Sequence, residues 1–389
     1  MPPRLSFRRR GAVVAALGTS MTVSWASSYY IPAVLAVPMA RDLGLSPTSV
    51  FGAFSMALVV SAIVGPWAGA RIDGFGGRGV LILSNLVFTA GLVLLAAAPS
   101  PVVMFLGWGV IGLGMGIGLY EAGFATLTGI YGEDARGPIT GITLIAGLAS
   151  TVGWPLSGLM LATWGWREAC LGWAVMQLCI ALPLNLLLPR AIILPVTSVA
   201  APTAINSPPR GTMILMAFIF AASTFNATAM ATHLPGLLQQ AGASHAVAIA
   251  AGALIGPAQV AARVFEFSLL RRFHPLSSTR LAAAAHPVAV VALATFGGPA
   301  AYAFSILHGA GNGILTIAKG TLPLAIFGAQ GYGQRLGWLN APGRILQSAA
   351  PLAFGLALAT WGLSAIWLTA GIGTAATLAL FILKPPDTR

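Results

Sequence analysis

Twelve runs of apolar residues, each long enough to cross a bilayer, determine what this chain can fold into. A transmembrane helix needs about 20 such residues. Only helices and closed barrels satisfy their backbone hydrogen bonds in lipid, and the sequence lacks the period-two alternation of a barrel. We therefore predict an all-α membrane protein with 12 transmembrane helices, near residues 11–35, 47–70, 79–98, 102–129, 137–162, 168–188, 211–239, 245–270, 279–297, 299–327, 335–360 and 364–383.

Composition indicates the same class. Hydrophobic residues make up 57% of the 389 residues and charged residues only 7%. A soluble domain carries about 25% charged residues. The start, M-P-P-R-L-S-F-R-R-R, followed by an apolar run has the pattern of a signal peptide. The run over 11–35 is too long for a signal peptide, so we expect the chain to keep it as its first span.

The distribution of basic residues predicts topology rather than nucleic-acid binding. The net charge is +12, and the basic residues lie at the ends of apolar runs, not in a patch with aromatic residues. With the N-terminus inside, Arg41 and Arg167 fall outside, and each adjoins an acid, Asp42 or Glu168. An even number of spans makes both termini cytoplasmic. We expect a monomeric multi-pass protein of a bacterial inner membrane.

The chain divides into two halves. Residues 189–210 are rich in Pro, Ser and Ala, with Arg near both ends. This composition predicts a cytoplasmic linker between two six-helix bundles, at 1–188 and 211–389.

Short stretches recur in the same order in both halves. L-A-T-W-G at 161–165 recurs at 358–362, and G-M-G-I-G at 114–118 matches G-A-G-N-G at 309–313. Equivalent spans keep the same orientation in the membrane, which predicts a parallel repeat and two pseudo-symmetric bundles.

Six plus six helices, a long central linker and a parallel repeat resemble the major facilitator superfamily. The strongest local sign is G-A-R-I-D-G-F-G-G-R at 69–78, which resembles a cytoplasmic loop signature of that superfamily. Gly74 and Arg71 depart from the signature, so its usual charge relay is altered here. The matching positions are Gly69, Asp73, Gly76 and Arg78.

Asp73 suits the N-terminus of a facing helix, where free N–H groups and the helix dipole favour a carboxylate. The resemblance implies that this helix is the eleventh span, which begins near Arg335. The contact would be either a latch that forms in one state of a transport cycle or a static cap of the loop.

Two further stretches are similar to a narrower group. These are A-L-I-G-P-A-Q-V-A-A-R-V at 253–264 and G-A-G-N-G-I-L-T-I-A-K-G-T-L-P-L-A-I-F-G at 309–328. They resemble a bacterial branch of the superfamily that is similar to monocarboxylate-type carriers and includes arsenite-efflux proteins.

No motif of an enzyme, a cofactor site or a metal site stands out. The sequence has no P-loop and no cluster of His, Cys and carboxylates at metal-ligand spacing. Cys170 and Cys179 would lie on opposite faces of one helix, so they cannot share a disulfide or a metal. The glycines at 112–118 lie inside a span, where small residues allow close packing of helices. We expect no enzymatic activity, no cofactor and no metal.

Glu121 is the one carboxylate in the apolar fourth span, within G-I-G-L-Y-E-A-G-F at 116–124. Charges at membrane depth usually face a cavity or a partner. Lys319, in the tenth span, lies at nearly the same depth, and the resemblance places the fourth and tenth spans along a central cavity. Three interpretations stay open: a permanent ion pair that fixes packing, a cytoplasmic gate, or a site for a proton or the substrate.

Two other spans carry ionisable residues. Arg263 and Glu266 share a helical face and resemble an acid–Arg pair of monocarboxylate carriers, in reversed order. They predict either a gate or loop anchor, or a substrate site. In the eleventh span, Asn340, Arg344 and Gln347 share a face. We predict that Arg344 and Gln347 line the substrate cavity, where the Arg344 guanidinium could bind an anion through two hydrogen bonds. The alternative is that Arg344 pairs with Glu266 or with backbone carbonyl groups.

Polar residues on other spans predict the lining of a substrate cavity, since a hydroxyl gains nothing on a lipid face. His233 is the repeat mate of Tyr30 and is either a proton or substrate site or a packing residue. The predicted lining residues are Ser24, Ser27, Ser28 and Tyr30 in the first half, and Asn226, His233 and Asn312 in the second.

We therefore predict a secondary active carrier that moves a small polar or anionic solute with protons, by alternating access. The stretch G-L-A-S-T-V-G-W-P-L-S-G at 147–158 loosely resembles the antiporter motif of the superfamily and favours export. The alternatives are arsenite or organoarsenical efflux, monocarboxylate-type uptake and, in another class, a membrane receptor on the same scaffold that transports nothing.

Overall fold

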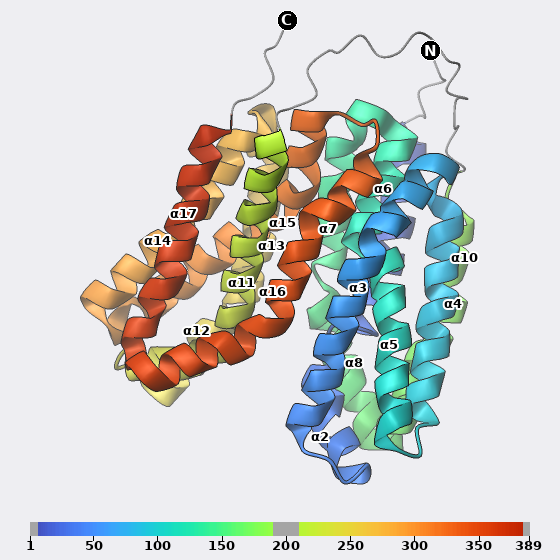
Figure 1. The fold of residues 1–389 in the computed structure, drawn as a ribbon, viewed down its shortest axis with the longest axis horizontal. Coiled ribbons are helices and arrows are strands. Elements are labelled where there is room, and N and C mark those ends of the chain that lie inside the picture. The colour runs from blue at the N-terminus through green and yellow to red at the C-terminus, as the bar shows by residue number, and fades with distance from the viewer. Residues whose placement is uncertain (1–6, 190–209, 384–389) are drawn as a thin grey trace, which may run out of the picture. The chain divides into compact units, whose positions relative to one another are not determined.

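The computed structural model describes residues 7–189 and 210–383, which fold into helices and turns without a β-strand, as the all-α prediction requires. The first half contains α1 (Phe7–Ala26), α2 (Pro32–Asp42), α3 (Pro47–Phe75), α4 (Gly77–Ala96), α5 (Pro101–Gly118), α6 (Tyr120–Tyr131), α7 (Arg136–Ala146), α8 (Ala149–Trp164), α9 (Trp166–Met176), the π-helix η2 (Gln177–Ala181) and α10 (Leu182–Leu186). The second half contains α11 (Arg210–Gln240), α12 (His245–Ala253), α13 (Ile255–Ser268), α14 (Pro275–Phe296), α15 (Ala301–Phe327), α16 (Tyr332–Trp361) and α17 (Ile366–Ile382) (Figure 1).

Among the described residues, eight helical stretches are long and apolar enough to cross a membrane. The predicted spans fall largely on helix, but several of them are interrupted or merge with a neighbour. The count of 12 spans therefore stays a prediction. So does the cytoplasmic location of both termini, because residues 1–6 and 384–389 lie outside the described part of the chain.

Two of the interruptions change the setting of predicted site residues. The first predicted span ends as α1 at Ala26 and resumes as α2 at Pro32, since proline fits the first turn of a helix but has no N–H to continue one. The fourth breaks at Leu119, whose extended backbone (φ −93°, ψ −163°) separates α5 from α6. Glu121 thus lies in the first turn of a new helix, not within a continuous one.

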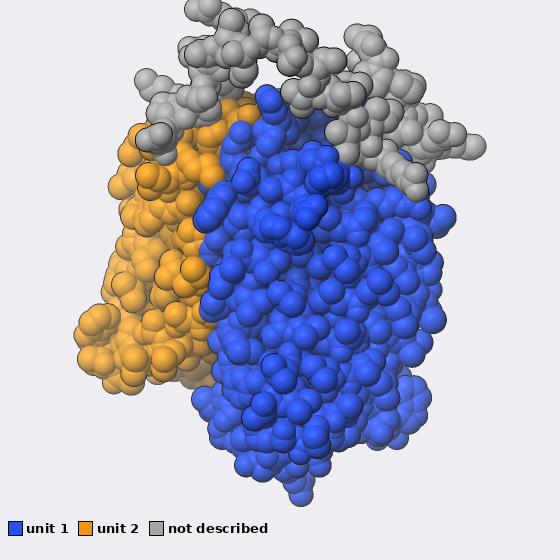
Figure 2. Space-filling view, turned by 45° about the vertical axis from the view of Figure 1, so that its right-hand side comes forward, with its two compact units in different colours: residues 1–202, 329–341 blue, residues 203–328, 342–389 orange. Residues whose placement is uncertain are grey.

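The chain forms two compact units, coloured separately in Figure 2. Unit 1 contains residues 1–202 and 329–341, and unit 2 contains residues 203–328 and 342–389. The predicted linker at 189–210 falls almost wholly outside the described residues. The predicted domain boundaries stay a prediction, but the start of α16 groups with unit 1 rather than with the rest of the second half.

Glycines on α5 let this helix pack closely between two neighbours in unit 1. A Cβ atom at Gly112 would lie 2.5 Å from the Ala57 carbonyl oxygen of α3, and one at Gly114 would lie 2.8 Å from the Phe88 ring of α4. Helices α4 and α5 accordingly run side by side (Figure 1). The interpretation of this glycine run as a packing surface is confirmed.

Unit 2 repeats the arrangement with α13, α14 and α15. Cβ atoms at Gly309 and Gly313 of α15 would lie 2.8 and 2.5 Å from backbone oxygens of α13. A Cβ atom at Gly311 would lie 2.6 Å from the Ala282 carbonyl oxygen of α14. The parallel repeat predicted from sequence is therefore visible in the packing of each unit taken by itself.

This packing corrects the register of the repeat. Gly112 and Gly309 each face the preceding partner helix, α3 or α13, so these two residues correspond, and G-L-G-M-G at 112–116 aligns with 309–313. The sequence match had instead aligned 114–118 with that stretch. In the corrected register Glu121 corresponds to Ala318, the direct neighbour of Lys319.

A buried polar network holds three helical elements of unit 1, α4, η2 and α10, together with the turn that follows α1. The Asn85 side-chain amide donates to Gln177 Oε1 (2.8 Å), and the Gln177 amide donates to Ser27 Oγ (2.8 Å). Asn185 Nδ2 donates to Asn85 Oδ1 (2.8 Å). Side-chain hydrogen bonds of this kind join helices where lipid offers no partner. The network also includes the π-helix, which carries Gln177.

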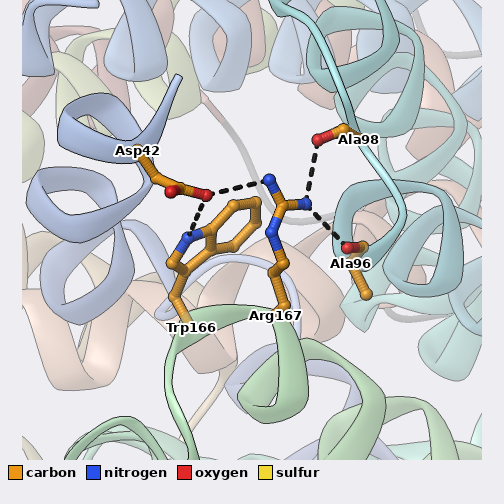
Figure 3. Close-up of polar contacts among 5 residues, drawn as sticks. All are labelled: Asp42, Ala96, Ala98, Trp166 and Arg167. Carbon is orange, nitrogen blue, oxygen red and sulfur yellow. Dashed lines mark hydrogen bonds and ion pairs between the residues drawn. The ribbon is translucent and has the colours of Figure 1, made fainter. Parts of the chain in front are cut away.

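Arg167 at the start of α9 joins the ends of three helices, as Figure 3 shows. Its Nη1 donates to the carbonyl oxygens of Ala96 and Ala98, both at 2.8 Å, and its Nη2 lies 2.8 Å from Asp42 Oδ2. Trp166 Nε1 donates to the same Asp42 oxygen (3.2 Å). The guanidinium therefore caps carbonyl groups at the end of α4, which have no partner within the helix.

Replacing Arg167 with Ala should lower the midpoint of thermal unfolding by about 1–2 °C, corresponding to roughly 1 kcal/mol for a partly exposed cap. The physical reason is that two carbonyl groups lose their donor, while the Asp42 carboxylate keeps only the Trp166 N–H. Differential scanning fluorimetry of the purified protein measures the change. Arg41→Ala is the matched control, because Arg41 is exposed on α2. Equal shifts in both variants would contradict the capping role.

Candidate functional site

The loop signature of unit 1 contacts the start of α16. Asp73 Oδ1 accepts a hydrogen bond from the Gly333 backbone N–H (2.8 Å), and Asp73 Oδ2 accepts one from the Gln334 N–H (2.9 Å). The carboxylate thus lies on the positive end of a helix, where N–H groups have no partner within the helix. The contact expected for Asp73 is present, while its role as a latch stays a prediction.

Glycines explain why α3 and the start of α16 can approach so closely. A Cβ atom at Gly333 would lie 2.6 Å from the Gly69 carbonyl oxygen, and one at Gly337 would lie 2.5 Å from Pro66 Cα. The backbone of Gly69, a residue of the signature, thus meets that of Gly333, which leaves no room for a side chain at either position. The side chain of Asp73, one turn further along α3, then reaches the helix start.

The remaining signature residues shape the turn between α3 and α4. Gly76 has φ +81°, a conformation that L side chains rarely adopt, and it both ends α3 and begins α4. Arg71, one of the departures from the signature, lies over the rings of Trp67 and Phe75 at 5.4 and 5.3 Å. Arg78 is half-buried at the start of α4.

Glu121 lies in unit 1 and Lys319 in unit 2, so each is described in its own unit. Glu121 is half-buried in the first turn of α6, next to Tyr120. Lys319 Nζ donates to Thr224 Oγ1 of α11 at 2.6 Å. The sequence did not single out Thr224 as this partner. The predicted pairing of Glu121 with Lys319 stays a prediction.

Unit 2 carries more basic than acidic side chains in its interior. Arg263 and Arg344 are 5% and 8% exposed, and Glu266 is buried on the same helix as Arg263. Arg263 Nε donates to the Gly313 carbonyl oxygen of α15 (3.4 Å). Gln347 is half-buried beyond Arg344. The structure thus places all four predicted residues at least partly inside the protein, and their roles stay predictions.

In unit 1, the predicted lining residues of the first span lie around the break between α1 and α2. Ser24, Ser27 and Ser28 are buried; Ser28 Oγ donates to the Ser24 carbonyl oxygen (2.6 Å), and Ser27 accepts from Gln177. Tyr30 is half-buried and meets Trp154 edge-on, with ring centroids 5.8 Å apart. The serines are thus engaged within the bundle.

Sequence reasoning missed an aromatic cluster around Tyr30. The Trp25 ring lies 5.1 Å from Tyr29, 6.3 Å from Tyr30 and 5.0 Å from Tyr120. All four are half-buried. The helical spacing of Trp25 and Tyr29 was a signal for one shared face, but only the fold brings Tyr120 to it.

In unit 2, the predicted lining residues divide between two places. His233 Nε2 lies 2.8 Å from the Pro351 carbonyl oxygen, and the His233 ring packs on Phe354. Asn226 and Asn312 line a small cavity inside unit 2 together with His286 and His308. The two histidines were not predicted. Each stands alone in an apolar run, although a histidine at membrane depth is itself a signal of a polar site.

Sequence comparison decides the family. A profile of the Major Facilitator Superfamily matches residues 14–315. The chain belongs to this superfamily. It is therefore a multi-pass membrane protein of a transporter family, and the resemblance seen in the loop signature is confirmed.

The chain spans about half the length, or less, of the curated relatives it matches. It is 31% identical over 195 residues to an uncharacterized 38 kDa protein of Thermoproteus tenax, covering 49% of each chain. It is 32% identical over 88 residues to monocarboxylate transporter 9 of Pongo abelii, covering 23% of this chain and 17% of the relative. It is 32% identical over 127 residues to a multidrug resistance protein B homolog of Mycobacterium tuberculosis, covering 32% of this chain and 23% of the relative.

Solved structures of transporters share the fold. The chain matches a human organic anion transporter with a TM-score of 0.73 at 16% identity, covering 97% of this chain and 100% of the other. It matches a proton:xylose symporter with a TM-score of 0.73 at 14% identity, covering 97% and 96%. Identities this low establish the fold alone.

Replacing Asp73 with Asn should loosen the contact between α3 and α16, because one charged acceptor of two backbone N–H groups is lost. Charge-assisted hydrogen bonds contribute about 1.5–3 kcal/mol. The population in which α3 and the start of α16 are in contact should therefore fall about tenfold relative to the population in which they are apart. Spin labels are attached at Gly74→Cys and Gln330→Cys, both exposed positions, after Cys170 and Cys179 are replaced. Double electron–electron resonance then measures the distance between the two labels.

Asp42→Asn is the matched control for this experiment, since it makes the same chemical change at the Arg167 contact of unit 1. The control should leave the distance distribution unchanged. A distribution that is also unchanged in Asp73→Asn would mean that the carboxylate does not hold the two helices together.

Proposed function

We propose that this chain is a proton-coupled carrier that exports a small organic anion across a bacterial inner membrane by alternating access, working as a monomer. Membership of a transporter family gives the general activity. The substrate class, the coupling to protons and the direction are proposals that rest on the polar residues of the two units.

The observation that carries the anion assignment is the excess of basic side chains inside unit 2. Arg263, Lys319 and Arg344 extend from three helices, α13, α15 and α16, whereas Glu266 is the acid among the buried residues described there. Charges at membrane depth are costly, so carriers keep them where they bind substrate or gate a path. A guanidinium and an ammonium in one bundle favour a carboxylate or a similar anion.

Lys319 and Arg344 are the residues we assign to the anion. Lys319 already donates to Thr224, and a Cβ atom at Gly343, the residue before Arg344, would lie 3.3 Å from Thr224 Oγ1. The backbone of α16 therefore passes beside the hydroxyl that Lys319 binds. Arg263 and Glu266 then act as a gate or an anchor of α13. The likeness to monocarboxylate transporter 9 over 88 residues supports the same substrate class.

A second candidate is the efflux of aromatic compounds, and the aromatic cluster of unit 1 favours it. Trp25, Tyr29, Tyr30 and Tyr120 present half-buried rings, which would stack on a planar substrate. Two Mycobacterium and yeast relatives are named multidrug resistance proteins. Arsenite efflux, monocarboxylate uptake and a receptor without transport remain alternatives that the same flux assay separates.

Proteoliposomes with an imposed pH gradient test the proposal. The probes are L-lactate and gluconate as anions, ethidium as an aromatic cation, xylose as a neutral sugar and arsenite. We expect flux of at least one anion that depends on the gradient, and Arg344→Gln or Lys319→Gln should lower its initial rate by about tenfold or more, since a charged hydrogen bond to the anion is lost.

Arg71→Gln is the control for these variants, because Arg71 is exposed on α3. Its flux should equal that of the unmodified protein. Flux of ethidium without either anion would favour the second candidate. The absence of flux for every probe in the unmodified protein would contradict the carrier assignment as stated.

Glu121 is the group we assign to gating or proton exchange in unit 1. In Glu121→Gln the side chain keeps its shape but cannot release a proton, so gradient-driven anion flux should fall about tenfold or more, while anion exchange at equal pH persists. The measurement is the ratio of these two fluxes in one preparation. An unchanged ratio would show that Glu121 has no coupling role.

A further inference from the structure

Two histidines from neighbouring helices meet in the interior of unit 2. His286 of α14 and His308 of α15 are 7% and 4% exposed. Their Nδ1 atoms lie 2.9 Å apart, and their ring centroids lie 4.8 Å apart. Two imidazoles are thus in direct hydrogen-bond contact in the interior of the bundle.

Close helix packing and one aromatic ring fix the geometry of the pair. Gly311, three residues after His308, lies against the Ala282 carbonyl oxygen of α14, which brings α14 and α15 together. The Phe304 ring, one turn before His308, is nearly parallel to the His308 ring at 6.0 Å and meets His286 edge-on at 5.9 Å. Both imidazoles are therefore held in place by side chains of the bundle itself.

The hydrogen bond fixes how many protons the neutral pair carries. One Nδ1 must donate and the other must accept. The donating imidazole, being neutral, has no proton on its Nε2, and the accepting one carries its proton on Nε2. One nitrogen of the pair is therefore basic. A proton that reaches the pair adds to this lone pair and makes an imidazolium with two N–H groups.

A cavity with acceptor groups lies next to the pair. It has a volume of about 20 Å³, room for one water molecule, and His286, His308, Asn226, Ser223 and Asn312 supply its polar lining. Asn226 Nδ2 donates to the Thr369 carbonyl oxygen (2.9 Å), which fixes the orientation of the amide. Among the described residues, Asn226 Oδ1 and His286 Nε2 are both buried without a hydrogen-bond partner.

These two atoms complement each other once the pair is protonated. An imidazolium is costly in an apolar setting unless its N–H groups find acceptors. Asn226 Oδ1 is such an acceptor, reached directly or through one water in the cavity. The same side chains therefore supply hydrogen-bond partners for both the neutral pair and the protonated pair.

The charged groups on the helices around the pair are engaged elsewhere. On α14, Arg280 donates to the Leu380 and Leu383 carbonyl oxygens. On α15, Lys319 donates to Thr224, and on α13 Arg263 donates to Gly313, with Glu266 buried on the same helix. On α11, His233 contacts the Pro351 carbonyl oxygen, and α17 has no titratable residue. None of these residues lines the cavity.

We propose that His286 and His308, with Asn226 as acceptor, form a proton-binding site inside the second bundle. The assignment rests on the proposed function, because it names a group that takes part in proton coupling. The proton adds to the bare Nε2 when the cavity communicates with water, and it leaves from the same atom. No other bond forms or breaks, and the site gains one positive charge.

Nitrogen NMR of histidine side chains tests the site without any substrate. The chain has five histidines, so protein labelled with ¹⁵N-histidine gives few imidazole signals, which single His→Gln variants assign. The full-length protein is titrated in lipid nanodiscs from pH 8 to pH 5, the range in which histidine ordinarily changes charge. We expect one imidazole of the pair to change from one N–H to two, an uptake of about one proton per molecule.

A pair that stays neutral down to pH 5 would overturn the proposal. In that case the contact is a packing hydrogen bond. This outcome differs from a failure of the proposed function, which would appear as a lack of gradient-driven flux in the proteoliposome assay. If gradient-driven flux is observed while the pair stays neutral, the proposed function stands and only the proposal for the histidine site is wrong.

Variants separate a coupled pair from two independent histidines. His308→Gln removes one imidazole and should displace the titration midpoint of His286 by more than about one pH unit, because the proton is held jointly. Asn226→Leu removes the acceptor and should suppress proton uptake above pH 5. His245→Gln is the control, since His245 is exposed at the start of α12. An unchanged His286 midpoint in both test variants would contradict a shared site.

Discussion

A polar group buried among apolar helices must find its hydrogen-bond partner inside the protein, because lipid offers none. Much of the described structure follows from this constraint. Many serine and threonine hydroxyls donate to carbonyl oxygens one turn back, as Thr126 does to Ala122. Larger groups are joined across helices, as in the Asn85–Gln177–Ser27 network and in the Arg167 cap. These contacts fix helix positions that apolar packing alone would leave free to slide.

By the same constraint, a buried polar atom that lacks a hydrogen-bond partner needs an explanation. His286 Nε2 and Asn226 Oδ1 are buried without a hydrogen-bond partner among the described residues of unit 2, beside a cavity of water size. In the protonated pair both Nε2 atoms carry a proton, so His286 Nε2 is then a donor for Asn226 Oδ1. Close helix packing through Gly311 makes the arrangement possible, so a residue without a side chain positions two side chains that carry chemistry.

Much of this could be predicted from the sequence. Long apolar runs predicted a helical membrane protein, and the glycine pattern predicted close packing of helices. The loop signature gave the Asp73 contact with the start of α16. What could not be predicted depends on breaks and on pairs distant in sequence. No proline lies near the extended Leu119 to signal the break between α5 and α6. His286 and His308 lie on different helices with no motif linking them, and Thr224 is one hydroxyl among many.

The central claim is that anion movement and proton movement are coupled in this carrier. The internal pH of proteoliposomes, recorded with trapped pyranine while gluconate is added outside, tests it most directly, because gluconate does not cross lipid unaided. The account predicts a change in internal pH that needs the protein, that reverses with the direction of the gluconate gradient and that disappears in His286→Gln. Gluconate entry without any change in internal pH would contradict it.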